Sequence, residues 1–120
     1  MSTNNSVDFS SFKNELSPVA LACFRVFFGN IRETLAKQGP QQKYEASLDD
    51  FLSLNEVADV EAVAQSIREI IKCKVEKKVD TYSCFYPFFA NVSIEGSKIR
   101  YSVLKDIEEE ISQVPAVFFV

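Results

Sequence analysis

Residues 47–72, SLDDFLSLNEVADVEAVAQSIREIIK, decide the fold of this chain. Ser47 opens a pattern like a capping box, with Asp in place of the usual Glu or Gln, and predicts a short helix. After a turn, Asp59 can cap a second helix that runs to about Lys72. Two short helices joined by a tight turn predict a helix-turn-helix. The apolar face of the second helix comprises Val60, Val63, Ala64, Ile67, Ile70 and Ile71.

The segment before this motif predicts a long apolar helix. Ser17 is a suitable N-cap, Pro18 suits the first helical position, and Gly39 followed by Pro40 ends the helix. The apolar arc of this helix spans about 220°, well beyond the width that one core contact needs. Two interpretations are open: the helix is central in the domain, or one flank meets a second chain. That flank consists of Val19, Cys23 and Val26.

Strands are predicted on both sides of the motif. Residues 43–46 alternate between polar and apolar and suit a single edge strand. After the helix-turn-helix the period changes to two, which predicts a strand over 73–79 and a connection or second strand over 81–86. Gly96 supplies the positive φ for a hairpin between two further apolar strands.

A last helix is predicted from Ser102 to about Gln113, with Pro115 just beyond its end. Its apolar residues recur at helical spacing and are expected to face the core. The acidic residues expected to face solvent are Asp106, Glu108, Glu109 and Glu110.

The length of 120 residues suits one domain. Residues 1–14 are rich in Ser and Asn and aperiodic, which predicts a mobile amino-terminal arm before a single α+β domain over 15–120. No apolar run is long enough to span a membrane, and the polar amino terminus is unlike a signal peptide. Three widely spaced cysteines without a CxxC pair indicate reduced thiols. We therefore expect a cytoplasmic protein with no membrane partner.

Residues that carry catalytic chemistry are scarce. The chain has no histidine, which excludes every mechanism with a histidine base or histidine metal ligand. It has three glycines and no phosphate-binding loop motif. The carboxylates are predicted at a helix start and on a solvent face rather than as a converging pair, and the cysteines as small buried side chains. We expect no enzyme, cofactor, metal or small-molecule substrate.

The formal net charge of −4 opposes a surface that grips nucleic acid on all sides. Residues 72–78, KCKVEKK, are nevertheless basic, with four lysines against one glutamate. These lysines could touch a phosphate backbone, or they could keep a strand soluble and prevent edge pairing. Both interpretations are open. The candidate DNA-backbone residues are Lys72, Lys74, Lys77 and Lys78, with Lys98 and Arg100 on the other arm of the hairpin.

The second helix of the motif is where a helix-turn-helix protein would read bases. Gln65, Ser66 and Arg68 on its outward face could contact base edges. Two glutamates on the same face would meet phosphates unfavourably, so this helix is not predicted to read a sequence alone. Aromatic residues within 82–89 could stack on bases, but that stretch has no interleaved Arg or Lys. We interpret these aromatic residues as core packing or a protein interface.

Three stretches of the chain carry a family resemblance. Leu16 and Ser17 open the long apolar helix. Residues 44–51, YEASLDDF, form a short strand that leads into the helix-turn-helix, and residues 85–101, FYPFFANVSIEGSKIRY, form a hairpin before the last helix. Over about residues 16–112 this pattern resembles the first winged-helix domain of the plasmid replication initiators, the iteron-binding Rep proteins. The resemblance implies a winged helix: helix, strand, helix-turn-helix, β-hairpin wing and carboxy-terminal helix.

In that family the first domain chiefly forms the dimer interface and adds backbone contacts, while a second winged helix supplies most base recognition. This sequence holds one such domain. The resemblance therefore implies a homodimer with weak auxiliary contact to the backbone of double-stranded DNA. An alternative is a protein-interaction module of a phage or mobile element that binds no nucleic acid. The expected dimer interface comprises Val19, Cys23 and Val26, with Val117, Phe118 and Phe119 of the apolar tail.

Overall fold

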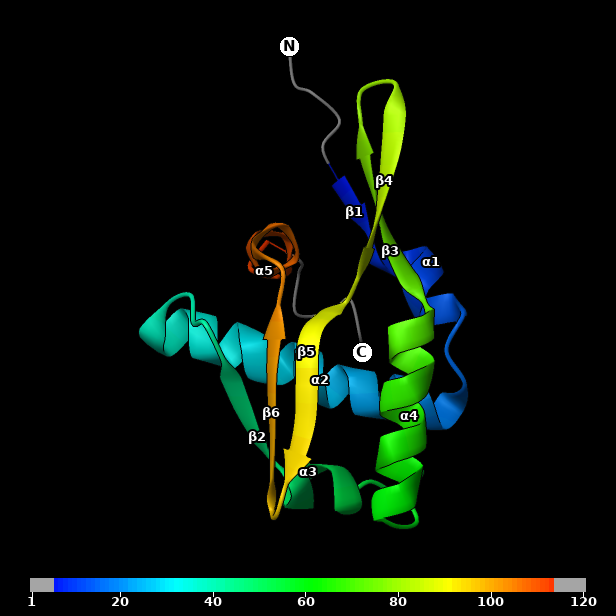
Figure 1. Cartoon of the computed structure of the whole chain (residues 1–120), viewed down its shortest axis with the longest axis vertical. Helices are drawn as coiled ribbons and strands as arrows, with labels where there is room; N and C mark the ends of the chain where they lie inside the picture. Colours follow the sequence, from blue (N-terminus) through cyan, green and yellow to red (C-terminus); the bar gives the residue numbers. More distant parts are fainter. Residues whose placement is uncertain (1–5, 114–120) are drawn as a thin grey trace.

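The computed structural model describes residues 6–113, which form a mixed α+β fold (Figure 1). This part of the chain forms five helices and six strands. In chain order the elements are β1 (Ser6–Asp8), α1 (Phe9–Asn14), α2 (Pro18–Gln38), β2 (Tyr44–Ser47), α3 (Leu48–Leu52), α4 (Val60–Lys72), β3 (Lys74–Val79), β4 (Tyr82–Pro87), β5 (Phe89–Glu95), β6 (Lys98–Val103) and α5 (Lys105–Ile111).

The strands form two antiparallel sheets of three strands each. The first has the order β1-β3-β4, and the second has the order β2-β6-β5. Phe88 separates β4 from β5, so the chain passes from one sheet into the other across a single buried residue. In Figure 1 the β3–β4 hairpin projects beyond the helices, while the tip of the β5–β6 hairpin lies beside α3. The predicted hairpin at Gly96 is confirmed, with φ of 64° at that residue.

Helix α2 lies at the centre of the described fold. It begins and ends as predicted: the Ser17 hydroxyl accepts a hydrogen bond from the Ala20 N–H at 3.3 Å, and Gly39 ends the helix with φ of 79°. The helix contacts α3, α4, α5 and β2, which supports the first of the two interpretations of its wide apolar arc. Its buried residues are Ala20, Ala22, Cys23, Phe24, Phe27, Phe28 and Ile31.

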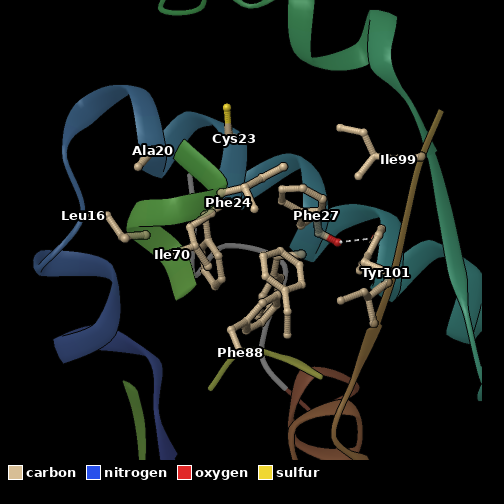
Figure 2. Close-up of a cluster of buried hydrophobic side chains, with 14 of the residues drawn as sticks. Leu16, Ala20, Cys23, Phe24, Phe27, Ile70, Phe88, Ile99 and Tyr101 are labelled. Atoms are coloured by element: carbon tan, nitrogen blue, oxygen red, sulfur yellow. Dashed lines mark hydrogen bonds between the residues drawn. The ribbon is translucent and has the colours of Figure 1, made fainter. Parts of the chain in front are cut away.

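Aromatic rings join α2 to the second sheet and to the junction between the two sheets (Figure 2). Phe27 packs edge-to-face against Phe89 of β5 and Tyr101 of β6, with ring centroids 4.9 Å apart in both pairs. Phe24 makes a similar contact with Phe88 at 4.8 Å. Such pairs add about 0.5–1.5 kcal/mol each beyond the area that they bury. These contacts fix the junction between β4 and β5 against the central helix.

The helix-turn-helix elements are close to their predicted bounds. Asp59 caps α4 by accepting a hydrogen bond from the Ala62 N–H at 2.9 Å, and α4 ends at Lys72. The first helix, α3, is short, and Ser47 makes no side-chain capping bond. The Leu48 N–H instead donates to the Ser97 carbonyl oxygen at 2.9 Å. The start of α3 is therefore tied to the tip of the β5–β6 hairpin.

The prediction of a mobile arm over 1–14 is wrong for residues 6–14, which form β1 and α1. Phe9 and Phe12 of α1 are buried, and the ring of Phe12 packs at a tilt against that of Phe24 of α2, with centroids 4.9 Å apart. Strand β1 pairs with β3. Two large aromatic side chains and a long-range strand pairing outweigh the polar local composition, which was the only basis for the prediction.

The last helix starts later than predicted. Ser102 and Val103 stay in β6, paired with β5, so α5 begins at Lys105. The outward orientation predicted for Glu108 is also wrong, because this side chain is buried, with 7% of its surface exposed. Glu108 lies on the same helical face as Ile107 and Ile111.

Candidate functional site

The β3–β4 hairpin carries the most exposed large aromatic side chains of the described residues, Phe85 at 64% and Tyr82 at 59%. Partners across an antiparallel pair share a face, so the register settles which side chains lie together. We call the face that carries Phe85 the hairpin face. It comprises Lys74, Glu76 and Lys78 of β3 with Ser83, Phe85 and Pro87 of β4.

Lys74 and Lys78 are exposed on the hairpin face, diagonal to Phe85 across the strand pair. Lys72 is exposed at the end of α4, where β3 begins. Within residues 6–113 none of these three lysines makes an ion pair. Three of the six residues predicted to contact the DNA backbone, Lys72, Lys74 and Lys78, are thus exposed and make no ion pair within residues 6–113. Sequence reasoning missed that β3 supplies the basic neighbours that β4 itself lacks.

Lys77 points to the opposite face of the hairpin and does not belong with the other lysines. Its side chain is only 18% exposed, and its Nζ lies 3.2 Å from Oδ2 of Asp106 in α5. The hydrogen bond to Asp106 raises the pKa of Lys77. The prediction of a DNA contact at this residue is therefore corrected: Lys77 joins the hairpin to α5.

Lys98 and Arg100 lie in β6, an arm of the Gly96 hairpin as predicted, but this hairpin belongs to a different sheet from Lys74 and Lys78. Both contact Glu45 on the neighbouring strand β2, at 3.1 and 3.7 Å. The carboxylate of Glu45 offsets part of the charge of both residues. Because they lie in a different sheet from Lys74 and Lys78, the six predicted cations do not form one surface.

Of the three residues on α4 that are predicted to contact base edges, one is buried and two are exposed beside a glutamate. Ser66 is buried, and its hydroxyl donates to the Ala62 carbonyl oxygen at 2.9 Å. Gln65 and Arg68 are exposed, but both hydrogen-bond to Glu61, at 3.5 and 3.1 Å. The prediction is therefore wrong for Ser66, and Arg68 is engaged in an ion pair.

Acidic side chains dominate the end of the molecule where α3, the start of α4 and the β5–β6 tip lie together (Figure 1). Arg68 of α4 and Lys98 of β6 already pair with glutamates. DNA phosphates would be repelled there. The exposed acidic residues are Asp49, Asp50, Glu56, Asp59, Glu61 and Glu95.

The residues of α2 that are predicted to form a dimer interface are buried or partly buried in the core. Cys23 is fully buried, and this burial raises the pKa of its thiol, so the prediction of an interface contact is wrong. Val19 and Val26 are half-buried against the core. The predicted contacts at Val117, Phe118 and Phe119 fall outside the described residues.

A buried polar network was not predicted from the sequence. The Tyr44 hydroxyl donates to Glu108, which also accepts from the Gln41 N–H at 3.3 Å. Burial, followed by the contact with Glu108, raises the pKa of Tyr44. The Tyr101 hydroxyl donates to the Phe27 carbonyl oxygen at 3.2 Å, as Figure 2 shows. The spacing of Glu108 within the apolar stripe of α5 was the signal that could have revealed it.

In residues 6–113 no group of three or more Cys, Asp or Glu side chains is placed to hold a metal ion. No helix of this part of the chain is both long and apolar enough to cross a membrane. Comparison with family models, curated proteins and solved structures finds no match for this chain.

Proposed function

We propose that this chain is a winged-helix domain that acts by forming a homodimer through the free edge of β4. The order of β2, α3, α4 and the β5–β6 hairpin supports the winged helix, as does the sheet order β2-β6-β5. In this interpretation the β3–β4 hairpin is an insertion between the second helix of the motif and the wing. The interface lies on this hairpin and not on α2.

The edge of β4 is the observation that carries this proposal. Within residues 6–113 β4 is the outermost strand of its sheet, and its sequence YSCFYP has no charge. Natural edge strands are usually protected by charged residues or by cover from another element. Here the only protecting residue in the strand is Pro87 at its end. Phe85 and Tyr82 add exposed aromatic surface, which is enriched at interfaces between proteins.

The backbone groups available for pairing can be derived from Pro87. Proline has no N–H, so its pair with Lys74 is a non-hydrogen-bonded pair. The two kinds of pair alternate along the ladder. Ser83 and Phe85 therefore direct their N–H and C=O groups away from β3, toward the free edge. A second copy can pair there about a two-fold axis, with Ser83 opposite Phe85 of the second copy.

A proline substitution tests the interface without disturbing the hairpin. Ser83→Pro removes an outward N–H that β3 does not use, whereas Ser83→Ala keeps that N–H. We expect light scattering at about 50 μM to report a dimer for the wild type and Ser83→Ala, and a monomer for Ser83→Pro. A monomeric wild type, or a dimeric Ser83→Pro variant, would rule out this interface.

The second part of the proposal is weak contact with the backbone of duplex DNA through Lys72, Lys74 and Lys78. A two-fold axis perpendicular to the joined sheet places both hairpin faces on the same side, so a dimer would present these lysines twice. We expect Lys74→Glu with Lys78→Glu to reduce the slope of log affinity against log salt by about 2 for each copy that contacts the duplex, and so by about 4 for the dimer. The matched control, Lys43→Glu with Lys105→Glu, changes the same charge at exposed lysines elsewhere.

The alternative, a protein-interaction module without nucleic-acid contact, is favoured by the acidic end around α3 and the start of α4. Under that alternative the wild type gives no shift with duplex DNA even at low salt. A shift that both double variants weaken equally would also count against the three lysines, since only total charge would then matter.

A further inference from the structure

A groove of about 270 Å³ lies between α4 and β5. Ala64, Ile67 and Arg68 line it from the helix, and Val92, Ser93 and Ile94 line it from the strand. Successive side chains of a strand point to opposite faces. Since three consecutive residues of β5 line the groove, the backbone edge of the strand itself forms one wall.

That edge of β5 is unpaired within the described residues, because β5 is the outermost strand of the order β2-β6-β5. Glu95 and Lys98 flank the two-residue turn of the β5–β6 hairpin and are expected to form a hydrogen-bonded pair. The alternation of the ladder then places Val92 and Ile94 in non-hydrogen-bonded pairs with β6. Their N–H and C=O groups therefore point into the groove.

The groove is apolar in its centre and acidic at its rim. Ile94 is 36% exposed, and Ala64 lies opposite it on α4. Glu95 follows Ile94 directly, and a hydrogen bond from the Ser93 hydroxyl at 2.6 Å lowers the pKa of Glu95, which is therefore charged at neutral pH. Arg68 is the cation of the lining, and Glu61 already pairs with it at 3.1 Å. Lys98 lies opposite Glu95 in β6, but it already contacts Glu45 at 3.1 Å.

We propose that this groove binds an extended segment of a partner protein in which apolar residues alternate with lysine or arginine. Such a segment adds a strand to β5 and receives hydrogen bonds from the backbone of Val92 and Ile94. Its apolar side chains lie against Ala64 and Ile67, and its basic side chains face Glu95 on the other side of the strand. The outward backbone groups of Val92 and Ile94 favour a polypeptide strand over nucleic acid as the occupant. This site is separate from the proposed homodimer interface at β4, which lies in the other sheet.

The probe is a short synthetic peptide of alternating lysine and leucine, which is added to the full chain. A peptide of alternating glutamate and leucine is the control for charge. We expect the lysine peptide to bind and to shift the amide resonances of Val92, Ser93, Ile94 and Ala64. Ile94→Lys should weaken binding at least tenfold, because it adds a cation and removes apolar surface. Ile94 is partly exposed, and thermal unfolding verifies that this variant is folded.

Phe85→Lys is the matched control, since it makes the same kind of change at an exposed apolar residue of the other sheet. We expect it to leave peptide affinity within twofold while it disrupts the dimer, and Ile94→Lys to leave the dimer intact. Equal binding of the glutamate peptide, resonance shifts confined to other residues, an unchanged affinity of Ile94→Lys, or no binding at about 1 mM peptide would each overturn the proposal.

Discussion

Glu69 of α4 accepts two hydrogen bonds from Ser17, from its backbone N–H at 3.2 Å and from its hydroxyl at 2.7 Å. Ser17 is also the N-cap of α2. One carboxylate thus holds the start of the central helix against the second helix of the helix-turn-helix, across 52 residues of sequence. The contact therefore holds α4 in place, and α4 forms one side of the groove.

We expect Glu69→Ala to reduce the free energy of unfolding by about 1.5–3 kcal/mol, because a charged acceptor for two partly buried donors is lost. Glu69→Gln keeps one acceptor oxygen and should lose about half as much. Urea denaturation monitored by circular dichroism measures both values. Equal stability of the wild type and Glu69→Ala would show that water replaces the carboxylate without cost.

Tyr44 predicts a loss of stability at alkaline pH. Its pKa is raised above the ordinary value of 10.0 in the folded state, so its contribution is complete below pH 10 and is lost as the pH rises beyond that value. We expect the free energy of unfolding of the wild type to fall more steeply than that of Tyr44→Phe above pH 10. Parallel curves from pH 8 to pH 11 would contradict the role of the buried hydroxyl.

The ion pair between Lys77 and Asp106 predicts a local effect on the β3–β4 hairpin. Asp106 is 45% exposed, which limits the loss in Asp106→Asn to about 1 kcal/mol or less. We expect faster amide hydrogen exchange in β3 and β4, and unchanged exchange in β5 and β6. Glu109→Gln, at an exposed acid of the same helix, serves as the control. Uniform changes across both sheets would point to global destabilisation instead.

The register of the proposed dimer predicts a covalent cross-link. With Ser83 opposite Phe85 of the second copy, Cys84 faces Cys84 of the second copy in a non-hydrogen-bonded pair, where Cα atoms are about 4.5 Å apart. Disulfides form at Cα distances of about 4.4–6.8 Å. We expect a mild thiol oxidant such as diamide to give a disulfide-linked dimer on non-reducing gels. Cys84→Ser should abolish the link and Cys73→Ser should retain it; the reverse pattern would refute this register.

Elements whose signals are local were predictable from the sequence. The start of α2 at Pro18, its end at Gly39, the cap at Asp59 and the turn at Gly96 all follow from backbone preferences within a few residues. A helix end or a tight turn satisfies its own hydrogen bonds nearby. The predicted bounds of α2 and α4 are accordingly confirmed.

The candidate surfaces depend on contacts between residues that are distant in the sequence. For these surfaces the predictions differ from the structure. Lys77 and Lys78 are adjacent in the sequence, yet one pairs with α5 and the other is exposed, because a strand alternates its faces and only the tertiary structure decides what covers each face. Phe9 and Phe12 are core residues because β1 pairs with β3.

The sequence by itself determined the α+β class, the bounds of α2 and α4 and the absence of histidine. Only the tertiary structure decided that Cys23 and Ser66 are buried and that Glu45 contacts Lys98 and Arg100. It also decided that β4 and β5 are the outermost strands of their sheets among residues 6–113. The physical reason is the range of the forces involved. Caps and turns act over one helical turn, whereas burial and strand pairing depend on which distant segments the folded chain brings together.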